Sequence, residues 1–272
     1  MKIREIEKRS SFMRVIFFMI MWGSLLFSSN CAEEVFKTQC ASCHLGYIAQ
    51  KKLIQNYENN NSDFNLTAPT LTELSFRLRD QVGDRRADKE SQVMEIEDFL
   101  LDYVNHPDKK KSILRERVLS HFKTMPKQKL TEDDAELLSE YMFDFSEKMI
   151  VKHSVKRYGY DEALVKAKKE NKIVLVEGYI TSCRGCIKMD REVFVEDEIK
   201  QALNKDFVLV KQNVLAKKLP LGLESVGTPA FYFFTNDGKH LIDGLQGTGD
   251  IEEFLDMLSL ILESRDEKRY AQ

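Results

Sequence analysis

The sequence predicts two domains, an all-α domain followed by an α/β domain, behind an N-terminal signal segment. The chain of 272 residues is long enough for two domains that each bury their own core. Apolar residues recur at helical spacing up to about residue 150, and beyond it short apolar strands alternate with amphipathic helices. We therefore expect the signal segment over 1–32, the first domain over 33–150 and the second over 151–272.

The N-terminus has the pattern of an export signal. Basic residues such as Lys2, Arg4 and Arg14 precede the apolar run 15–27, and small residues follow that run. The run is shorter than the roughly 20 residues that a membrane-spanning helix needs. We therefore expect an exported, periplasmic protein. Two routes to a membrane stay open, an uncleaved signal that serves as an anchor and a lipid group on Cys31.

Helices are expected throughout the first domain. Two sets of apolar residues repeat every three or four positions, as along one face of a helix: Ile96, Phe99, Leu100 and Tyr103, then Leu137, Leu138, Tyr141 and Phe145. The acidic stretch that follows Thr131 is a capping signal at the start of the second helix.

The second domain is expected to be a sheet with covering helices. The predicted elements, in chain order, are a helix over 161–171, strands over 173–177, 207–211, 230–235 and 240–242, and a closing helix over 250–264. Strands that alternate with helices indicate an α/β domain.

Charge and cysteine usage restrict the function. A formal net charge of -3 argues against nucleic acid as a partner. Of the five cysteines, Cys31 lies at the processing site, and the other four form two C-x-x-C pairs. An exported chain with this arrangement has no further pair for a purely structural disulfide. The two pairs are therefore expected to carry chemistry.

Cys40, Cys43 and His44 form a C-x-x-C-H motif, the pattern of c-type haem attachment. Two thiols on one helical turn reach the two vinyl groups of a haem, and the adjacent imidazole lies beneath the iron. The alternative is a zinc knuckle, which needs two more ligands nearby. The second cysteine pair is too distant in the sequence for usual zinc spacing. We expect one covalent haem.

Residues around this motif resemble a small monohaem cytochrome c over about 33–150. The similar stretches are Val35-Phe36, Ala68-Pro69-Thr70-Leu71, Met125-Pro126 and the closing helix 133–145. The resemblance implies that the carbonyl of Pro69 orients His44 and that Met125 is the sixth iron ligand, beside His44. The segment between Pro69 and Met125 is longer and more charged than in minimal members. His121 and His106 therefore remain alternatives for the sixth ligand.

Cys183 and Cys186 form the second pair, at the start of a predicted helix that follows the strand 173–177. The positive end of a helix stabilises a thiolate at the first cysteine, and Arg184 acts in the same direction. Thr228-Pro229 precedes the next apolar strand, and it predicts a cis proline that faces the dithiol. Strand, C-x-x-C, helix and Thr-Pro together predict a redox dithiol.

The segment 155–265 resembles the thioredoxin superfamily, in the branch near the C-terminal domain of the disulfide reductase DsbD. The similar stretches include 163–168, 206–210 and Gly227-Thr228-Pro229-Ala230-Phe231. The resemblance implies that Glu177 is a buried acid that relays protons to Cys186. A solvated glutamate at the strand end is the alternative. The family usually has tryptophan before the first cysteine, where this chain has Ser182, so the redox direction is not implied.

These features together predict an exported thiol–disulfide oxidoreductase with an electron-transfer haem. Dithiols of this fold have potentials between about -270 and -120 mV, and Met/His ligation raises the potential of a haem. Electrons therefore run downhill from dithiol to haem. Expected partners are redox proteins with thiols or disulfides, and another cytochrome or electron acceptor. Two alternatives stay open: a partner-specific reductant for cytochrome maturation or sulfur metabolism with an electronically independent haem, and a non-enzymatic redox-sensing or docking protein.

Overall fold

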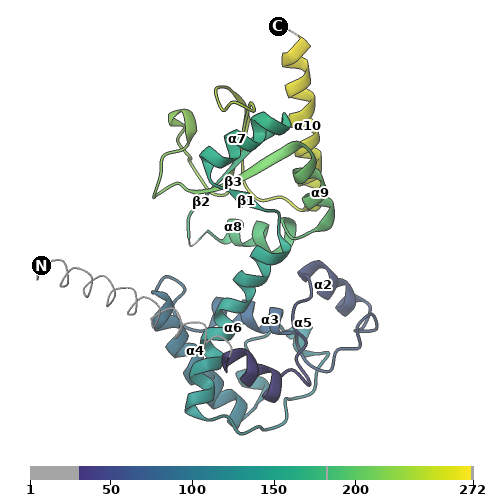
Figure 1. Ribbon diagram of the computed structural model, residues 1–272. Helices are drawn as coiled ribbons and strands as arrows, with labels where there is room; N and C mark the ends of the chain where they lie inside the picture. Colours follow the sequence, from purple (N-terminus) through teal and green to yellow (C-terminus); the bar gives the residue numbers. More distant parts are fainter. Residues whose placement is uncertain (1–30, 182, 271–272) are drawn as a thin grey trace, which may run out of the picture. The chain divides into compact units, whose positions relative to one another are not determined.

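A computed structural model describes residues 31–181 and 183–270 of the chain, and the side chains of 31–181 and 183–266 (Figure 1). Most of the predicted signal segment and Ser182 thus lie outside the described residues. The chain divides into two compact units. The first comprises residues up to 47 together with 56–146, and the second comprises 48–55 together with the residues from 147 onward. Within the described residues, no helix has the length and apolar character needed to cross a membrane.

Helices make up the regular structure of the first unit, as predicted, and its described residues contain no strand. The chain is helical over 31–39. The further helices that contribute residues to this unit are α2 (Gln50–Glu58), α3 (Leu71–Gln81), α4 (Lys89–Asn105), the short η1 (Lys109–Lys111), α5 (Glu116–Leu119) and α6 (Glu132–His153).

Side-chain caps define where these helices begin. The Thr131 hydroxyl accepts a hydrogen bond from the Asp134 N–H, which confirms the capping signal at the start of α6. Asp88 caps α4 in the same way by accepting from Ser91 N–H. The apolar faces of the helices form the core, whose most buried members include Leu71, Leu78, Ile96, Ala135 and Leu138.

A five-stranded mixed sheet forms the centre of the second unit. Its strands are β1 (Arg157–Tyr158), β2 (Ile173–Tyr179), β3 (Phe207–Asn213), β4 (Ala230–Phe234) and β5 (Leu241–Gln246), in the spatial order β1-β3-β2-β4-β5. The pairs β1–β3 and β3–β2 are parallel, whereas β2–β4 and β4–β5 are antiparallel. β2 is the central strand and is buried on both faces, which explains its continuous apolar sequence.

Helices cover both faces of this sheet (Figure 1). Val174 and Val176 pack with Ala163 and Ala167 of α7 (Tyr160–Glu170). Residues of the opposite parity, such as Leu175, form the other core, where the covering helices are α8 (Arg184–Lys188), η2 (Met189–Val193), α9 (Asp197–Asp206) and α10 (Ile251–Tyr270). Strand side chains alternate between faces, so Glu177 shares the face of Leu175 and is directed toward the α8 side.

The predicted α/β elements are present, and the differences are local. β5 extends to Gln246 because its pairing with β4 continues through the polar Asp243 and Gly244. The prediction did not include β1, which has two residues, or α9, whose buried residues are only Ile199 and Leu203. Such short apolar patterns are weak signals in a sequence.

Candidate functional site

Cys183 and Cys186 form a disulfide at the beginning of α8, with their Cα atoms 5.3 Å apart. Cys183 occupies the N-cap position of α8, and its Sγ accepts a hydrogen bond from the Cys186 N–H at 3.0 Å. A backbone N–H directed at Sγ stabilises the negative charge of a thiolate there once the disulfide is reduced. Cys183 is 7% exposed and Cys186 is 2% exposed, so the first sulfur is the more accessible.

Pro229 packs against the turn between the two cysteines. The Thr228–Pro229 peptide is cis, which confirms the prediction from the sequence. A Cβ atom added to Gly185 would lie 2.8 Å from Pro229 Cδ and 2.7 Å from Thr248 Cγ2. Both distances are too short for a real contact. Gly185 therefore permits the close approach of Pro229 to the dithiol, and a larger residue would separate the two segments.

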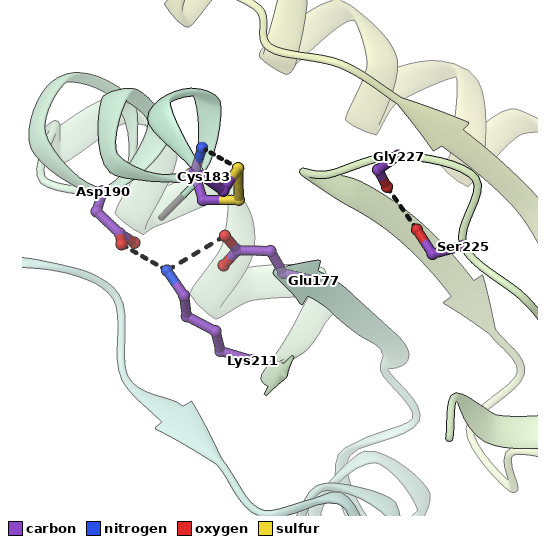
Figure 2. Close-up of a disulfide and its surroundings, with 7 residues drawn as sticks. Glu177, Cys183, Asp190, Lys211, Ser225 and Gly227 are labelled. Atoms are coloured by element: carbon purple, nitrogen blue, oxygen red, sulfur yellow. Dashed lines mark hydrogen bonds and ion pairs between the residues drawn. A yellow bond between two sulfur atoms is a disulfide. The ribbon is translucent and has the colours of Figure 1, made fainter. Parts of the chain in front are cut away.

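Glu177 is fully buried in β2, and the alternative reading of a solvated glutamate at a strand end is wrong. Figure 2 shows its carboxylate directed toward the disulfide. Neither carboxylate oxygen accepts a hydrogen bond within the described part of the chain, although Lys211 Nζ lies 3.3 Å from Oε1. Burial raises the pKa of Glu177 to about 7, and the ammonium of Lys211 offsets part of this rise.

A line of charged side chains continues from Glu177 away from the disulfide. Lys211 lies between Glu177 and Asp190, with Nζ 2.5 Å from Asp190 Oδ2 (Figure 2). Arg157 contacts the other Asp190 oxygen through Nη2 at 2.5 Å. The carboxylate of Asp190 therefore forms ion pairs with two cations, Arg157 and Lys211. Lys211 therefore keeps its ion pair with Asp190 when Glu177 is uncharged.

Sequence reasoning missed Lys211, although a signal was present. The two apolar runs Ile173–Glu177 and Phe207–Lys211 have the same length and end in opposite charges. In the sheet these runs pair in parallel with Glu177 directly beside Lys211. Aligning the two runs would have predicted the ion pair. No comparable sequence pattern indicated Asp190 or Arg157. Asp190 lies in η2, the continuation of α8, and Arg157 lies on β1, the shortest strand.

Comparison with known families identifies this part of the chain. Residues 160–261 match the family model described as a thioredoxin-like domain. This segment is therefore a thioredoxin-like domain. It contains Cys183, Cys186, Glu177 and Pro229. Among curated proteins, none matches the chain significantly.

Several solved structures are similar to the chain. They include the DsbH oxidoreductase (17% identity over 40% of this chain and 85% of that chain, TM-score 0.34). A thioredoxin from Thermus thermophilus has 27% identity over 40% of this chain and 88% of its own, with a TM-score of 0.35. The oxidised C-terminal domain of Neisseria meningitidis DsbD has 20% identity over 36% of this chain and 88% of its own, with a TM-score of 0.30.

The C-x-x-C-H motif lies in the first unit, on a helical turn that continues the helix 31–39. Cys43 N–H and His44 N–H both donate to the Cys40 carbonyl, at 3.1 and 2.9 Å. Cys40 and Cys43 are free thiols; the first is half-buried and the second is exposed. Burial, and then the neighbouring Cys43, raise the pKa of Cys40 to about 11.

Pro69 holds the imidazole of His44 by a hydrogen bond. His44 Nδ1 lies 2.7 Å from the Pro69 carbonyl oxygen, which can only accept, so Nδ1 carries the proton. Burial lowers the pKa of His44, and the hydrogen bond to Pro69 partly opposes that effect. A neutral ring with its proton on Nδ1 has a lone pair on Nε2. This is the state in which an imidazole ligates a metal.

The three candidates for a sixth iron ligand lie in different environments. Met125 is half-buried in the coil between α5 and α6. His121 is stacked on the ring of Tyr57, with ring centroids 5.0 Å apart. His106 ends α4 with its side chain 68% exposed, and its Nδ1 lies 3.9 Å from Asp102. Across the described ranges, no group of three or more His, Cys, Asp and Glu side chains is placed to hold a metal ion.

Proposed function

We propose that the chain is an exported thiol–disulfide oxidoreductase that works through Cys183 and Cys186 and carries one covalently attached c-type haem at Cys40, Cys43 and His44. The observation that carries the enzymatic part is the Cys183–Cys186 disulfide at a helix N-terminus, packed beside cis-Pro229 in a thioredoxin-like domain. Its partners are redox proteins with thiols or disulfides, and its place is the periplasm, as the sequence pattern of residues 1–32 indicates.

The reduced dithiol transfers two electrons to a substrate disulfide in two steps. The Cys183 thiolate attacks one substrate sulfur, so that a mixed disulfide forms and the other substrate sulfur leaves as a thiolate. The Cys186 thiol then loses its proton and attacks Cys183 Sγ. The second substrate thiolate leaves, and the Cys183–Cys186 disulfide is restored. The reverse sequence oxidises a substrate dithiol.

Glu177 is suited to move the proton of Cys186. With a pKa of about 7, its carboxyl group gains and loses a proton near neutral pH, which is the requirement for a general acid or base. It lies on the sheet face that α8 covers, and its carboxylate is directed toward the disulfide (Figure 2). Lys211 is the charged neighbour that stabilises the ionised carboxylate after it releases the proton.

The order of the two sulfurs is testable by trapping. Cys186→Ser should accumulate mixed disulfides with partner proteins in cells, because the attacking Cys183 remains and the resolving sulfur is absent. Cys183→Ser should trap none, since Cys186 is less exposed and the Cys186 N–H is directed at the sulfur of Cys183. Non-reducing gels followed by mass spectrometry detect the mixed disulfides formed by either variant. Trapping by Cys183→Ser alone would reverse the roles, and the double variant is the control.

The first unit supplies the groups that a c-type haem requires. Cys40 and Cys43 present two free thiols on one helical turn, and the His44 ring has its lone pair on Nε2. Covalent bonds from the two sulfurs would hold the porphyrin, and His44 would be the proximal ligand. A haem bound there provides one-electron transfer. Leu45, which follows the motif, is 50% exposed and offers apolar surface beside such a group.

Met125 is the proposed sixth ligand. Replacing it by histidine should lower the reduction potential of the haem, because Met/His ligation gives a higher potential than ligation by two histidines. His121→Ala is the matched control and should leave the potential near that of the wild type, because the His121 ring packs on Tyr57. Spectroelectrochemical titration measures the haem reduction potential of both variants. A change of axial ligation in His121→Ala, with none in Met125→His, would assign the ligand to His121.

A further inference from the structure

One peptide group joins His44 to the half-buried carboxylate of Glu73. The carbonyl of the Pro69–Thr70 peptide accepts from His44 Nδ1 at 2.7 Å. The N–H of the same peptide group, on Thr70, donates to Glu73 Oε2 at 3.0 Å. The two hydrogen bonds therefore lie in series, with the imidazole at one end and the carboxylate at the other. Hydrogen bonds arranged in series polarise and strengthen one another.

The carboxylate of Glu73 is fixed in place from several sides. It forms a capping box with Thr70 at the start of α3, and Tyr57 donates its hydroxyl to both Glu73 oxygens, at 2.8 and 2.7 Å. The Tyr57 and Thr70 side chains are themselves buried. The first turn of α3 is also attached to the backbone that follows His44, because Leu71 N–H donates to the Leu45 carbonyl at 2.7 Å.

We propose that Glu73 is a positioning residue that acts on His44 through the Pro69–Thr70 peptide and lowers the reduction potential of the haem. Its negative charge polarises the peptide, so that the Pro69 carbonyl becomes a stronger acceptor and draws the Nδ1 proton of His44 toward itself. Nε2 then becomes a stronger electron donor, and a stronger donor stabilises the oxidised iron. This inference rests on the haem attachment proposed above.

Glu73→Gln tests the effect of the charge. Glutamine retains the size of the side chain and an oxygen that accepts from Thr70 N–H and from the Tyr57 hydroxyl, so the cap is conserved while the charge and the second bond from Tyr57 are lost. The reduction potential should rise, with a change of about threefold to tenfold in the ratio of reduced to oxidised haem against a fixed mediator. Asp88→Asn is the matched control, because it removes a capping carboxylate from α4 that has no link to His44.

Tyr57→Phe tests the sign of the effect. Tyr57 draws part of the Glu73 charge to its own hydroxyl, so its removal leaves more of that charge for Thr70 N–H. At pH 8 this variant should shift the potential downward, opposite to Glu73→Gln. A merely structural role for Glu73 would move both variants in the same direction. Covalent haem with an unchanged potential in Glu73→Gln, or shifts of equal sign in the two variants, would overturn the proposal.

A measurement without haem separates this inference from the haem assignment. In the full chain with Cys40→Ala and Cys43→Ala, the ring nitrogen signals of His44 report the strength of its hydrogen bond to Pro69 by NMR. Adding Glu73→Gln should move the Nδ1–H signal upfield, and adding Asp88→Asn should not. A wild-type chain that lacks haem would contradict the proposed function only. An unmoved His44 signal would overturn the role of Glu73.

Discussion

Replacing both Cys40 and Cys43 by alanine is expected to abolish covalent haem entirely. These two free thiols lie on one helical turn, and the described part of the chain has one other free cysteine, Cys31, outside the motif. A thioether bond survives denaturation, whereas the proposed ligation by His44 and Met125 would not. A denaturing gel stained for haem peroxidase activity should show a band for the wild type and none for the double variant.

The control for this experiment is the Cys183→Ala and Cys186→Ala double variant, which should keep its haem band because these cysteines lie in the thioredoxin-like domain. Expression requires a host with an active cytochrome maturation pathway. A wild type without haem in such a host would contradict the proposal. A haem band that persists after Cys40 and Cys43 are both replaced would place the attachment elsewhere.

The dithiol site could be predicted largely from the sequence because its parts have fixed spacing. A strand, the cysteine pair, a helix and Thr228-Pro229 occur in order, and the cis peptide at Pro229 follows the prediction. The burial of Glu177 was harder to predict from a single residue. It depends on β2 being the central strand, and the sheet order follows from the pairing of β2 with both β3 and β4.

The connection between His44 and Glu73 could not be predicted from the sequence. The pattern Thr70-x-x-Glu73 is a capping box and could have been recognised, but its connection to His44 requires that Pro69 and His44 be in contact. That contact joins residues 25 positions apart. Met125 lies in a coil, where no periodicity determines the direction of a side chain. Its assignment therefore depends on the resemblance to monohaem cytochromes c.

Glu73 and Glu177 differ in the hydrogen bonds that their carboxylates accept. Burial raises the pKa of Glu73, and the hydrogen bonds that it accepts from Tyr57 and Thr70 offset part of this rise. Glu177 accepts none within the described residues, so burial raises its pKa to about 7. The hydrogen bonds of Glu73 favour its ionised form. Their absence leaves Glu177 able to exchange its proton near neutral pH.

Glu177→Gln should therefore stabilise the oxidised thioredoxin-like domain at alkaline pH. The folded domain keeps the Glu177 proton up to about pH 7, whereas the unfolded chain loses it near the ordinary value of 4.5. Between these values the folded state binds more protons, so its stability falls as pH rises. The shift corresponds to roughly 3 kcal/mol in the free energy of unfolding. The variant should gain about that amount at pH 8 and little below pH 4.5.

Hydrogen exchange of β2 peptides, measured by mass spectrometry, reports the unfolding of this domain alone. Lys211 remains paired with Asp190 in the variant, so no cation is left without a partner. Glu224→Gln is the matched control, since it removes an exposed carboxylate from the same domain and should leave the pH dependence unchanged. A Glu177→Gln domain that is less stable than the wild type at pH 8 would mean that Lys211 holds Glu177 ionised. Glu177 could then not deliver a proton to Cys186.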